Sequence, residues 1–166
     1  MNHPNLGVDF GHCSIAALKQ LTGYLGIEIF NAGGLGGAGS PYATDKWNML
    51  LSSGRRVWGY ASDDHHGQAD AGCGWITAYV KNLSLDAVLH ALHQGRFYAS
   101  TGVTIEKIEV TGQKIRIEAS NAHRIVAVSQ DGRRVATADA SRLEYCLLSN
   151  QAYVRFECWG KGEQMA

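Results

Sequence analysis

The chain of 166 residues lacks an excess of charge, because fifteen lysine and arginine residues balance fifteen aspartate and glutamate residues. Neither sign forms a long run, which excludes the basic surface used to bind nucleic acid or anionic membranes. The chain also lacks an apolar run of the ~20 residues needed to cross a bilayer. Its first residues lack the basic and apolar regions of a signal peptide, so we expect a cytoplasmic protein. No nucleic-acid partner and no membrane partner are expected.

Cysteine is scarce, and its spacing excludes two common classes of site. Four cysteines are present, and no two of them form a Cys-x-x-Cys pair, which argues against a zinc ribbon or a thioredoxin-like motif. No serine lies in a Gly-x-Ser-x-Gly elbow, which argues against a serine hydrolase. With 45% apolar residues, the chain is still long enough to bury a sizeable core.

The first hundred residues alternate between helical and strand-like patterns. Helices are predicted over 14–24, 44–52 and 84–94, and strands over 26–30, 56–60 and 75–80. Such a succession favours parallel strands joined by helical crossovers. Thr44 or Asp45 is the expected N-cap of the second helix.

After about Gly102 the pattern changes to short strands, several of which alternate apolar with charged residues. The predicted strands cover 105–110, 114–118, 125–128, 134–136, 143–147 and 153–157, with an Asp-Gly hairpin signal at 131–132. We therefore expect a β/α domain over 1–102, a β-rich subdomain over 103–160 and a tail over 161–166.

A glycine-rich segment at 34–39 matches the Gly-x-Gly-x-x-Gly pattern of dinucleotide-binding loops. In those folds the first glycine ends a strand and the third opens a helix, so that the phosphate meets the helix N-terminus. Here residues 31–33 separate the expected strand from the first glycine, and residues 40–44 follow the third. The spacing favours a simple glycine loop over a nucleotide site.

Two carboxylates and two imidazoles directly follow one expected strand, at Asp63, Asp64, His65 and His66. An Asp-x-His pair at a strand end presents one oxygen and one nitrogen ligand together, which suits a divalent transition metal. Asp64 with His66 and Asp63 with His65 both have this spacing, and only one pair can point toward the same side. A metal site is therefore the first hypothesis for this chain.

Five blocks occur in order along the chain: His-Pro-Asn at 3–5, Gly-Ile-Glu-Ile-Phe-Asn at 26–31, Asp-Lys-Trp-Asn-Met-Leu-Leu-Ser-Ser-Gly at 45–54, Trp-Gly-Tyr-Ala-Ser-Asp-Asp-His-His-Gly at 58–67 and Gly-Arg-Phe-Tyr-Ala-Ser-Thr-Gly at 95–102. Together they resemble the PHP (polymerase and histidinol phosphatase) domain, in its branch of metal-dependent phosphoesterases with a β-rich C-terminal extension. The resemblance implies an α/β fold. It would be a partial, truncated TIM-like β/α barrel of PHP type followed by a small antiparallel β-sandwich or sheet.

The same resemblance implies a divalent metal site, for Zn, Mn or Fe, at the carboxyl rim of the barrel. His3 would be one ligand, although a histidine so near a terminus is by itself more typical of a solvated residue. Asp64 and His66 would be ligands with catalytic roles, and Asp63 with His65 is the alternative register. The family pattern Asp-Asp-x-His favours the first pair, and the preceding serine favours the second. Arg96 would contact a phosphate or brace the barrel wall.

The implied reaction is hydrolysis of a small phosphorylated substrate by a metal-activated water. The opening His-x-His block of the family, and further His and Glu ligands, have no counterpart in this sequence. The alternative is therefore a catalytically silent, truncated PHP remnant that acts as an oligomeric binding or assembly module. A half barrel leaves an open strand edge, so we expect a homo-oligomer, with a dimer favoured, that covers this edge.

Overall fold

The computed structural model describes residues 1–67, 71–162 and 164–166. Within these residues, α-helix is confined to three segments: α1 (Ile15–Gln20), α2 (Thr44–Ser52) and α3 (Leu85–Gln94). Two of the three have serine caps, because Ser14 Oγ accepts the amide of Ala17 and Ser84 Oγ accepts that of Ala87. The N-cap of α2 is instead Ala43, which has no side-chain cap, so the expectation of Thr44 or Asp45 was wrong.

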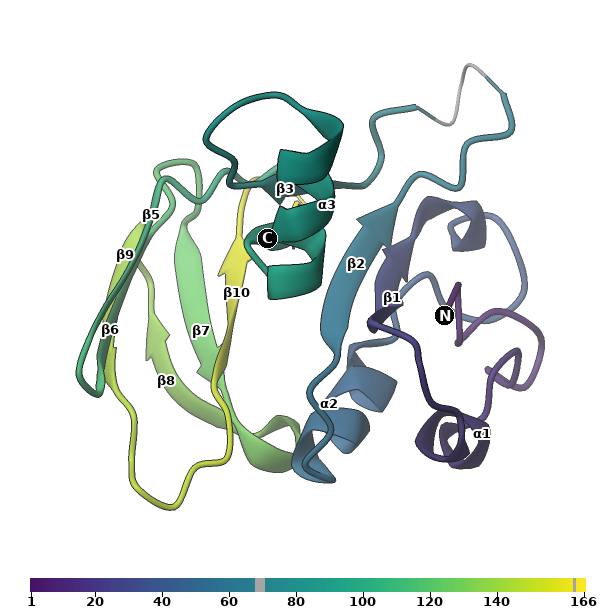
Figure 1. Ribbon diagram of the computed structural model, residues 1–166, viewed down its shortest axis with the longest axis horizontal. Coiled ribbons are helices and arrows are strands. Elements are labelled where there is room, and N and C mark those ends of the chain that lie inside the picture. The colour runs from purple at the N-terminus through teal and green to yellow at the C-terminus, as the bar shows by residue number, and fades with distance from the viewer. Residues whose placement is uncertain (68–70, 163) are drawn as a thin grey trace.

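A parallel strand pair forms the N-terminal part of the fold (Figure 1). β1 (Gly26–Asn31) and β2 (Trp58–Ser62) run side by side, with α2 in the connection between them and a short 3-10 turn, η1 (Ala32–Gly34), after β1. Leu18, Ile27, Leu50 and Val57 are buried together between the helices and this pair. This strand, helix and strand unit agrees with the sequence prediction for residues 26–62.

The next strands do not continue the parallel arrangement. β3 (Trp75–Ala78) and β4 (Phe97–Ser100) pair antiparallel, with Trp75 opposite Ser100. Their connection contains α3, which ends at the left-handed Gly95 (φ 67°). Because α3 leads the chain back to the strand that it left, it is not a crossover between parallel strands. The expectation of an α/β fold with a partial TIM-like barrel was therefore wrong: the chain is β-rich, and among the described residues three of the four sheets are antiparallel.

Two three-stranded antiparallel sheets form the C-terminal part (Figure 1). One has the order β5 (Lys107–Thr111), β6 (Lys114–Glu118) and β9 (Arg142–Cys146). The other has the order β10 (Arg155–Trp159), β7 (Arg124–Val128) and β8 (Arg134–Ala138). A 3-10 turn, η3 (Gln130–Gly132), joins β7 to β8, with left-handed Asp131 and Gly132. The predicted Asp-Gly hairpin is thus confirmed.

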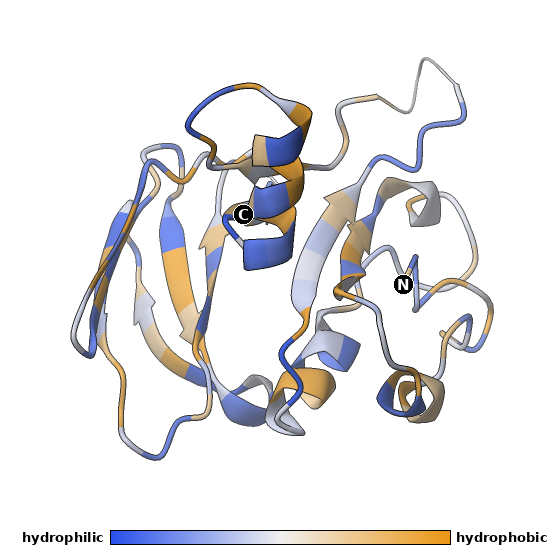
Figure 2. Ribbon diagram, in the orientation of Figure 1, coloured by the Kyte–Doolittle hydropathy of each residue, from blue (hydrophilic) through white to orange (hydrophobic). Residues whose placement is uncertain are grey.

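The two sheets enclose an apolar core. Its members come from both sheets and from the loops that connect them: Val103, Ile117, Ala119, Ala122, Ile125, Ala127, Leu143 and Cys158. Figure 2 shows the corresponding apolar stretch along β7. The tail also belongs to this part, because Ala166 and Cys158 exchange main-chain hydrogen bonds. Glu163 of the predicted tail lies outside the described residues.

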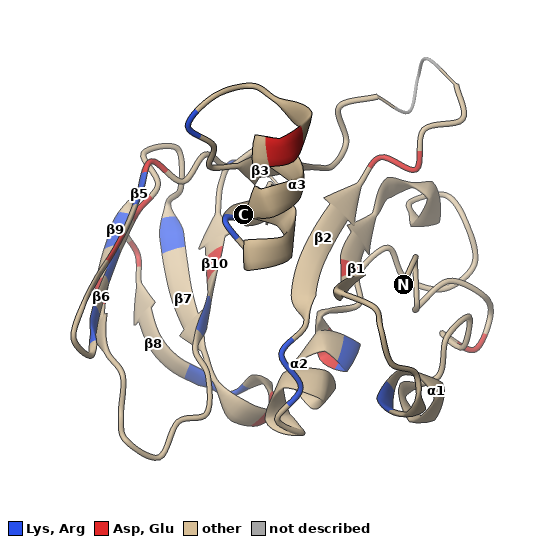
Figure 3. Cartoon of the chain, viewed as in Figure 1, with Lys and Arg blue, Asp and Glu red and all other residues tan. Residues whose placement is uncertain are grey.

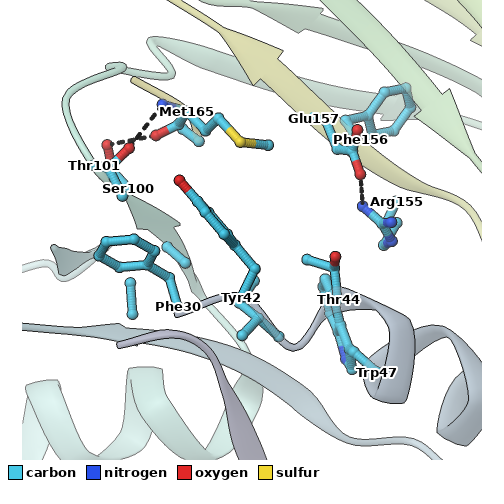
Figure 4. Close-up of a pocket in the computed structure, with 14 residues that line it drawn as sticks. Phe30, Tyr42, Thr44, Trp47, Ser100, Thr101, Arg155, Phe156, Glu157 and Met165 are labelled. Carbon is cyan, nitrogen blue, oxygen red and sulfur yellow. Dashed lines mark hydrogen bonds and ion pairs between the residues drawn. The ribbon is translucent and has the colours of Figure 1, made fainter. Parts of the chain in front are cut away.

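Polar contacts join α2 to the C-terminal sheets. Arg155 Nε donates to Asn48 Oδ1 at 2.9 Å, its guanidinium lies 5.5 Å from the Trp47 ring centroid, and its Nη1 donates to Glu157 Oε1 at 2.7 Å. Trp47, Arg155 and Glu157 line a mainly apolar cavity of ≈ 60 Å³ (Figure 4). Since a water molecule in liquid occupies ≈ 30 Å³, this cavity has room for about two waters and is too small for a phosphorylated substrate.

The outer edge of β1 does not form the open barrel edge that the sequence suggested. The amino group of Met1 donates to Gly26 O at 2.9 Å, and the amide of Glu28 donates to Met1 O at 2.9 Å. The premise of the predicted oligomer interface is therefore absent, while the oligomeric state itself stays a prediction. Among the described residues, no helix is long and apolar enough to cross a bilayer.

Candidate metal centre

The candidate centre lies where β1 and β2 end. Asn31, the last residue of β1, is opposite Ser62, the last residue of β2, and Asp63 and Asp64 follow directly. Figure 3 shows this acidic segment beyond the end of β2. The carboxyl ends of parallel strands are a common place for ligand sites, because the loops that follow them carry polar groups into one crevice. The local βαβ unit is sufficient for this placement, and no barrel is needed.

The Asp63 carboxylate is fully engaged in hydrogen bonds within its own loop. Its Oδ1 accepts the amides of Cys73 (2.7 Å) and Gly74 (2.6 Å), and its Oδ2 accepts the amide of Gly72 (2.8 Å). Three N–H donors on one carboxylate leave little capacity for a metal ion. Asp63 therefore closes the loop after β2.

Asp63 should make the stability of this loop depend on pH. Burial alone would raise the pKa of its carboxyl group, but the three amides of residues 72–74 and the charge of His65 outweigh burial and lower the pKa below the usual 3.8. A carboxyl pKa that is lowered on folding contributes stability that is complete above the unfolded value and is lost as the pH falls through the folded value.

We expect Asp63→Asn to lower the free energy of unfolding at pH 7 by about 1–2 kcal/mol, since charge-assisted hydrogen bonds are lost from a partly exposed site. The difference from the native protein should begin to shrink once the pH falls below the unfolded value of 3.8, because the unfolded carboxyl group then takes up a proton, and it should disappear below the lowered folded pKa. Urea unfolding at pH 7 and pH 3 measures both values, with the exposed Asp9→Asn as the control. A difference that grows on acidification would contradict this role.

Asp64 points toward the end of β1. Its backbone is left-handed (φ 52°), and its amide donates to Ser62 Oγ at 3.0 Å. A Cβ added to Gly33 would lie 2.7 Å from Asp64 Oδ2 and 3.0 Å from Asn31 Oδ1. Residue 33 must therefore be glycine for both oxygens to keep their positions. Asp64 Oδ2 and Asn31 Oδ1, one from each strand end, therefore lie close to the same glycine.

The amide oxygen of Asn31 is buried and has no hydrogen-bond partner. The side-chain nitrogen of Asn31 donates to Glu28 Oε2 at 2.9 Å, and because a carboxylate only accepts, this contact defines which end of the amide faces Asp64. Asn31 is 1% exposed, so its oxygen also lacks bulk water. A buried acceptor without a donor is unfavourable by about 1–3 kcal/mol, which a cation at this position would relieve.

His3 lies beside the Glu28 carboxylate, which Asn31 also contacts. Its amide donates to Glu28 Oε2 at 2.7 Å, its ring packs edge-on against His12 with centroids 4.4 Å apart, and its Nδ1 is buried without a partner. Its backbone is left-handed (φ 27°), an uncommon conformation for a residue other than glycine. Glu28 is thus shared by His3 and Asn31, each of which has an unpartnered buried atom.

His66 and Arg96 differ in how they relate to this centre. His66 Nδ1 lies 2.5 Å from the main-chain oxygen of Asp64 and 3.8 Å from its Oδ1, and the imidazole is 80% exposed. Arg96 lies between α3 and β4 and lines another groove, with Tyr79 and Lys107 among its walls. His3, Asp64 and His66 do not line that groove, so the structure does not bring Arg96 to the candidate centre.

The donor set fits a hard or borderline divalent ion only in part. Carboxylate and amide oxygens with imidazole nitrogens suit such ions. The unpartnered Oδ1 of Asn31 and Nδ1 of His3 are therefore potential ligands. However, no group of three or more His, Cys, Asp or Glu side chains is ready to hold a metal within the ranges that the structure describes. Asn31 is therefore an essential part of any site here, and His3 and His66 would have to turn toward Asp64.

A cleft of ≈ 410 Å³ lies along β1 and β2, and it shares Glu28 and Ser62, but none of the candidate ligands, with this centre. Its walls are Met1, Asn2, Leu25, Gly26, Glu28, Tyr60, Ala61 and Ser62. The volume lies within the range of small-molecule sites. No lysine or arginine side chain is among these walls.

Comparison of the chain with protein-family models, with curated proteins and with solved structures found no match. The similarity of the five blocks to the PHP domain therefore stays a prediction.

Sequence reasoning missed Glu28, Asn31 and Gly33. The first two occur in the block 26–31 and Gly33 follows it, but none resembles a typical metal-ligand pattern. The available signal was a glutamate inside an otherwise apolar strand and an asparagine at its end, since polar residues in such positions require partners.

Proposed function

We propose that this protein binds a divalent metal ion at the ends of β1 and β2 and hydrolyses a phosphate ester there. Asp64, Asn31, His3 and His66 would hold the ion. The observation that carries the proposal is the unpartnered, buried Oδ1 of Asn31, which meets the Asp64 carboxylate over Gly33. The proposal does not include a barrel.

In the proposed reaction the metal ion activates the substrate and water, and the protein side chains orient the ligands and the substrate. A bound divalent ion would polarise a phosphoryl oxygen and lower the pKa of a water molecule, so that hydroxide is available near neutral pH. Glu28 orients His3 and Asn31 through the hydrogen bonds that it accepts. The cleft beside Tyr60 and Ser62 would receive the leaving group of the ester.

His66→Ala and His65→Ala provide a matched test of this assignment. The two imidazoles are neighbours in an exposed turn, but only His66 lies against Asp64. We expect His66→Ala to weaken Mn²⁺ binding by roughly 10–100-fold, in line with the loss of a group that supports a metal site. His65→Ala should leave the affinity within about threefold of the native value, because His65 lies in the other register.

Isothermal titration with Mn²⁺ and Zn²⁺ measures the affinities, and hydrolysis of a chromogenic phosphate ester with each metal measures the activity. An equal loss of Mn²⁺ affinity in His66→Ala and His65→Ala would contradict the assignment of Asp64 and His66 as ligands. No metal binding and no turnover by the folded native protein would reject the proposal.

A second candidate is the catalytically silent binding or assembly module. It is favoured by the lack of a ready group of three His, Cys, Asp or Glu ligands in the described part of the chain. Metal-dependent turnover that disappears in Asp64→Ala would eliminate this candidate. Metal binding without turnover by the native protein would favour it.

A further inference from the structure

Lys46 is a buried cation that the proposed chemistry does not use. It lies in α2, is 7% exposed, and its Nζ donates to Pro4 O at 2.6 Å, Phe10 O at 2.7 Å and Cys13 O at 2.7 Å. An ammonium group has three donors, and all three are used here. Buried lysines are rare unless they are paired, and in this case main-chain carbonyls take the place of a carboxylate.

The three acceptors bracket both imidazoles of the N-terminal loop (residues 3–13). Pro4 directly follows His3, while Phe10 and Cys13 lie on either side of His12. The rings of His3 and His12 meet edge-on, with an interplanar angle of 62°. One ammonium group therefore holds the backbone at both ends of the loop, next to each member of the pair.

A second contact from α2 supports the same loop. Asn5 is 5% exposed, and its Nδ2 donates to Asp45 Oδ1 at 2.7 Å and to Tyr42 O at 2.9 Å. Burial lowers the pKa of Lys46, and the adjacent Asp45 carboxylate raises it in opposition. The first turns of α2 thus supply a cation and an anion, each of which binds the loop.

We infer that Lys46 is a positioning residue for the candidate metal centre, which orders the N-terminal loop so that the His3 amide stays on Glu28 and the His3 ring stays against His12. This inference rests on the proposed function. A non-glycine residue persists in a left-handed conformation only where its surroundings determine it. For His3 these surroundings are Glu28 on its amide and Lys46 on the carbonyl of the next residue.

Lys46→Met tests the inference, because it keeps the length of the side chain and removes its charge and three donors. Hydrogen exchange should accelerate at least about tenfold at the amides of His12 and Cys13, which are bonded within the loop. The affinity for Mn²⁺ should fall roughly 10–100-fold, as for other residues that orient metal ligands. Lys19→Met, on the exposed face of α1, should change neither value.

A double-mutant cycle separates positioning from general stabilisation. If Lys46 acts through His3, then Lys46→Met in a His3→Ala background should weaken Mn²⁺ binding by less than about threefold. The inference would be overturned if Lys46→Met weakened Mn²⁺ binding by the same factor in the native and His3→Ala backgrounds. Unchanged hydrogen exchange at the loop amides would overturn it as well. If Lys46→Met does not fold, Lys46→Gln, which retains two N–H donors, is measured in the same cycle.

The exchange measurement also separates this inference from the proposed function. If the native protein binds no Mn²⁺, the proposed function fails, and the role of Lys46 in ordering the loop is decided by exchange alone. Accelerated exchange at His12 and Cys13 in Lys46→Met then supports that role. Unchanged exchange refutes it.

Discussion

Asp64→Ala should abolish the metal-dependent hydrolysis of a phosphate ester and weaken Mn²⁺ binding at least about 100-fold, the upper end of what the loss of a supporting residue costs. The Asp64 carboxylate and the unpartnered Oδ1 of Asn31 both lie close to Gly33, and this carboxylate supplies the charged oxygen of the proposed site. Isothermal titration and a chromogenic ester assay measure the two losses.

The fold should survive this substitution. Asp64 is 32% exposed at its side chain, and its amide contact with Ser62 Oγ does not depend on the carboxylate. Asp86→Ala, in the first turn of α3, is the matched control and should retain metal affinity and activity. Native activity in Asp64→Ala would show that hydrolysis takes place elsewhere on the chain.

Arg155→Met should lower the free energy of unfolding by about 3–5 kcal/mol, the range for breaking a buried ion pair from one side. Arg155 and Glu157 have side chains only 9% and 14% exposed. Figure 4 shows the Arg155 guanidinium beside Glu157 and near Trp47 at the junction of α2 with β10. Its removal leaves a buried carboxylate without its cation and removes the hydrogen bond to Asn48.

Arg124→Met provides the comparison, because Arg124 pairs with Asp139 at a site where the side chains are 49% and 69% exposed. Solvent screens such a pair, so its loss should change the free energy of unfolding far less than the loss of Arg155 does. Urea unfolding followed by tryptophan fluorescence measures both variants. Similar losses for the two would mean that the junction between α2 and the C-terminal sheets contributes little to stability.

Local patterns were sufficient to predict most of the elements. The helix over 84–94 was recognisable from its spacing, its serine cap and its final glycine, all of which act within one or two turns. The hairpin at Asp131 and Gly132 follows from the left-handed backbone that these residues accept easily. The N-cap of α2 was missed because Ala43 has no side chain that signals a cap.

The pairing of strands was not predictable in the same way. β3 and β4 have only four residues each, and such short segments can pair in either direction. Which direction they adopt depends on the path of the chain through α3 and on contacts with β2, both of which are long-range. The expected parallel barrel failed at this step, although its individual strands and helices were present.

In the candidate centre, too, residues with a local signal were predicted and residues that depend on long-range contacts were not. Asp64, His66 and His3 were recognisable because acids and imidazoles cluster beside a strand end and a proline. Asn31, Glu28 and Lys46 were not, since their roles depend on partners that are distant in the sequence or supplied by folding. Lys46 is 42 residues from Pro4, whose carbonyl it binds.

By itself, the sequence determined where most helices and strands form, although not β4, and that an acid-imidazole pair follows β2, because these properties depend on neighbours within a few residues. The tertiary structure decided three further points: β3 pairs antiparallel with β4, Asp63 serves the loop while Asp64 faces Asn31, and a lysine of α2 holds the loop that carries His3. Each of these depends on contacts between distant segments, and only packing of the whole chain selects among the alternatives that local pattern permits.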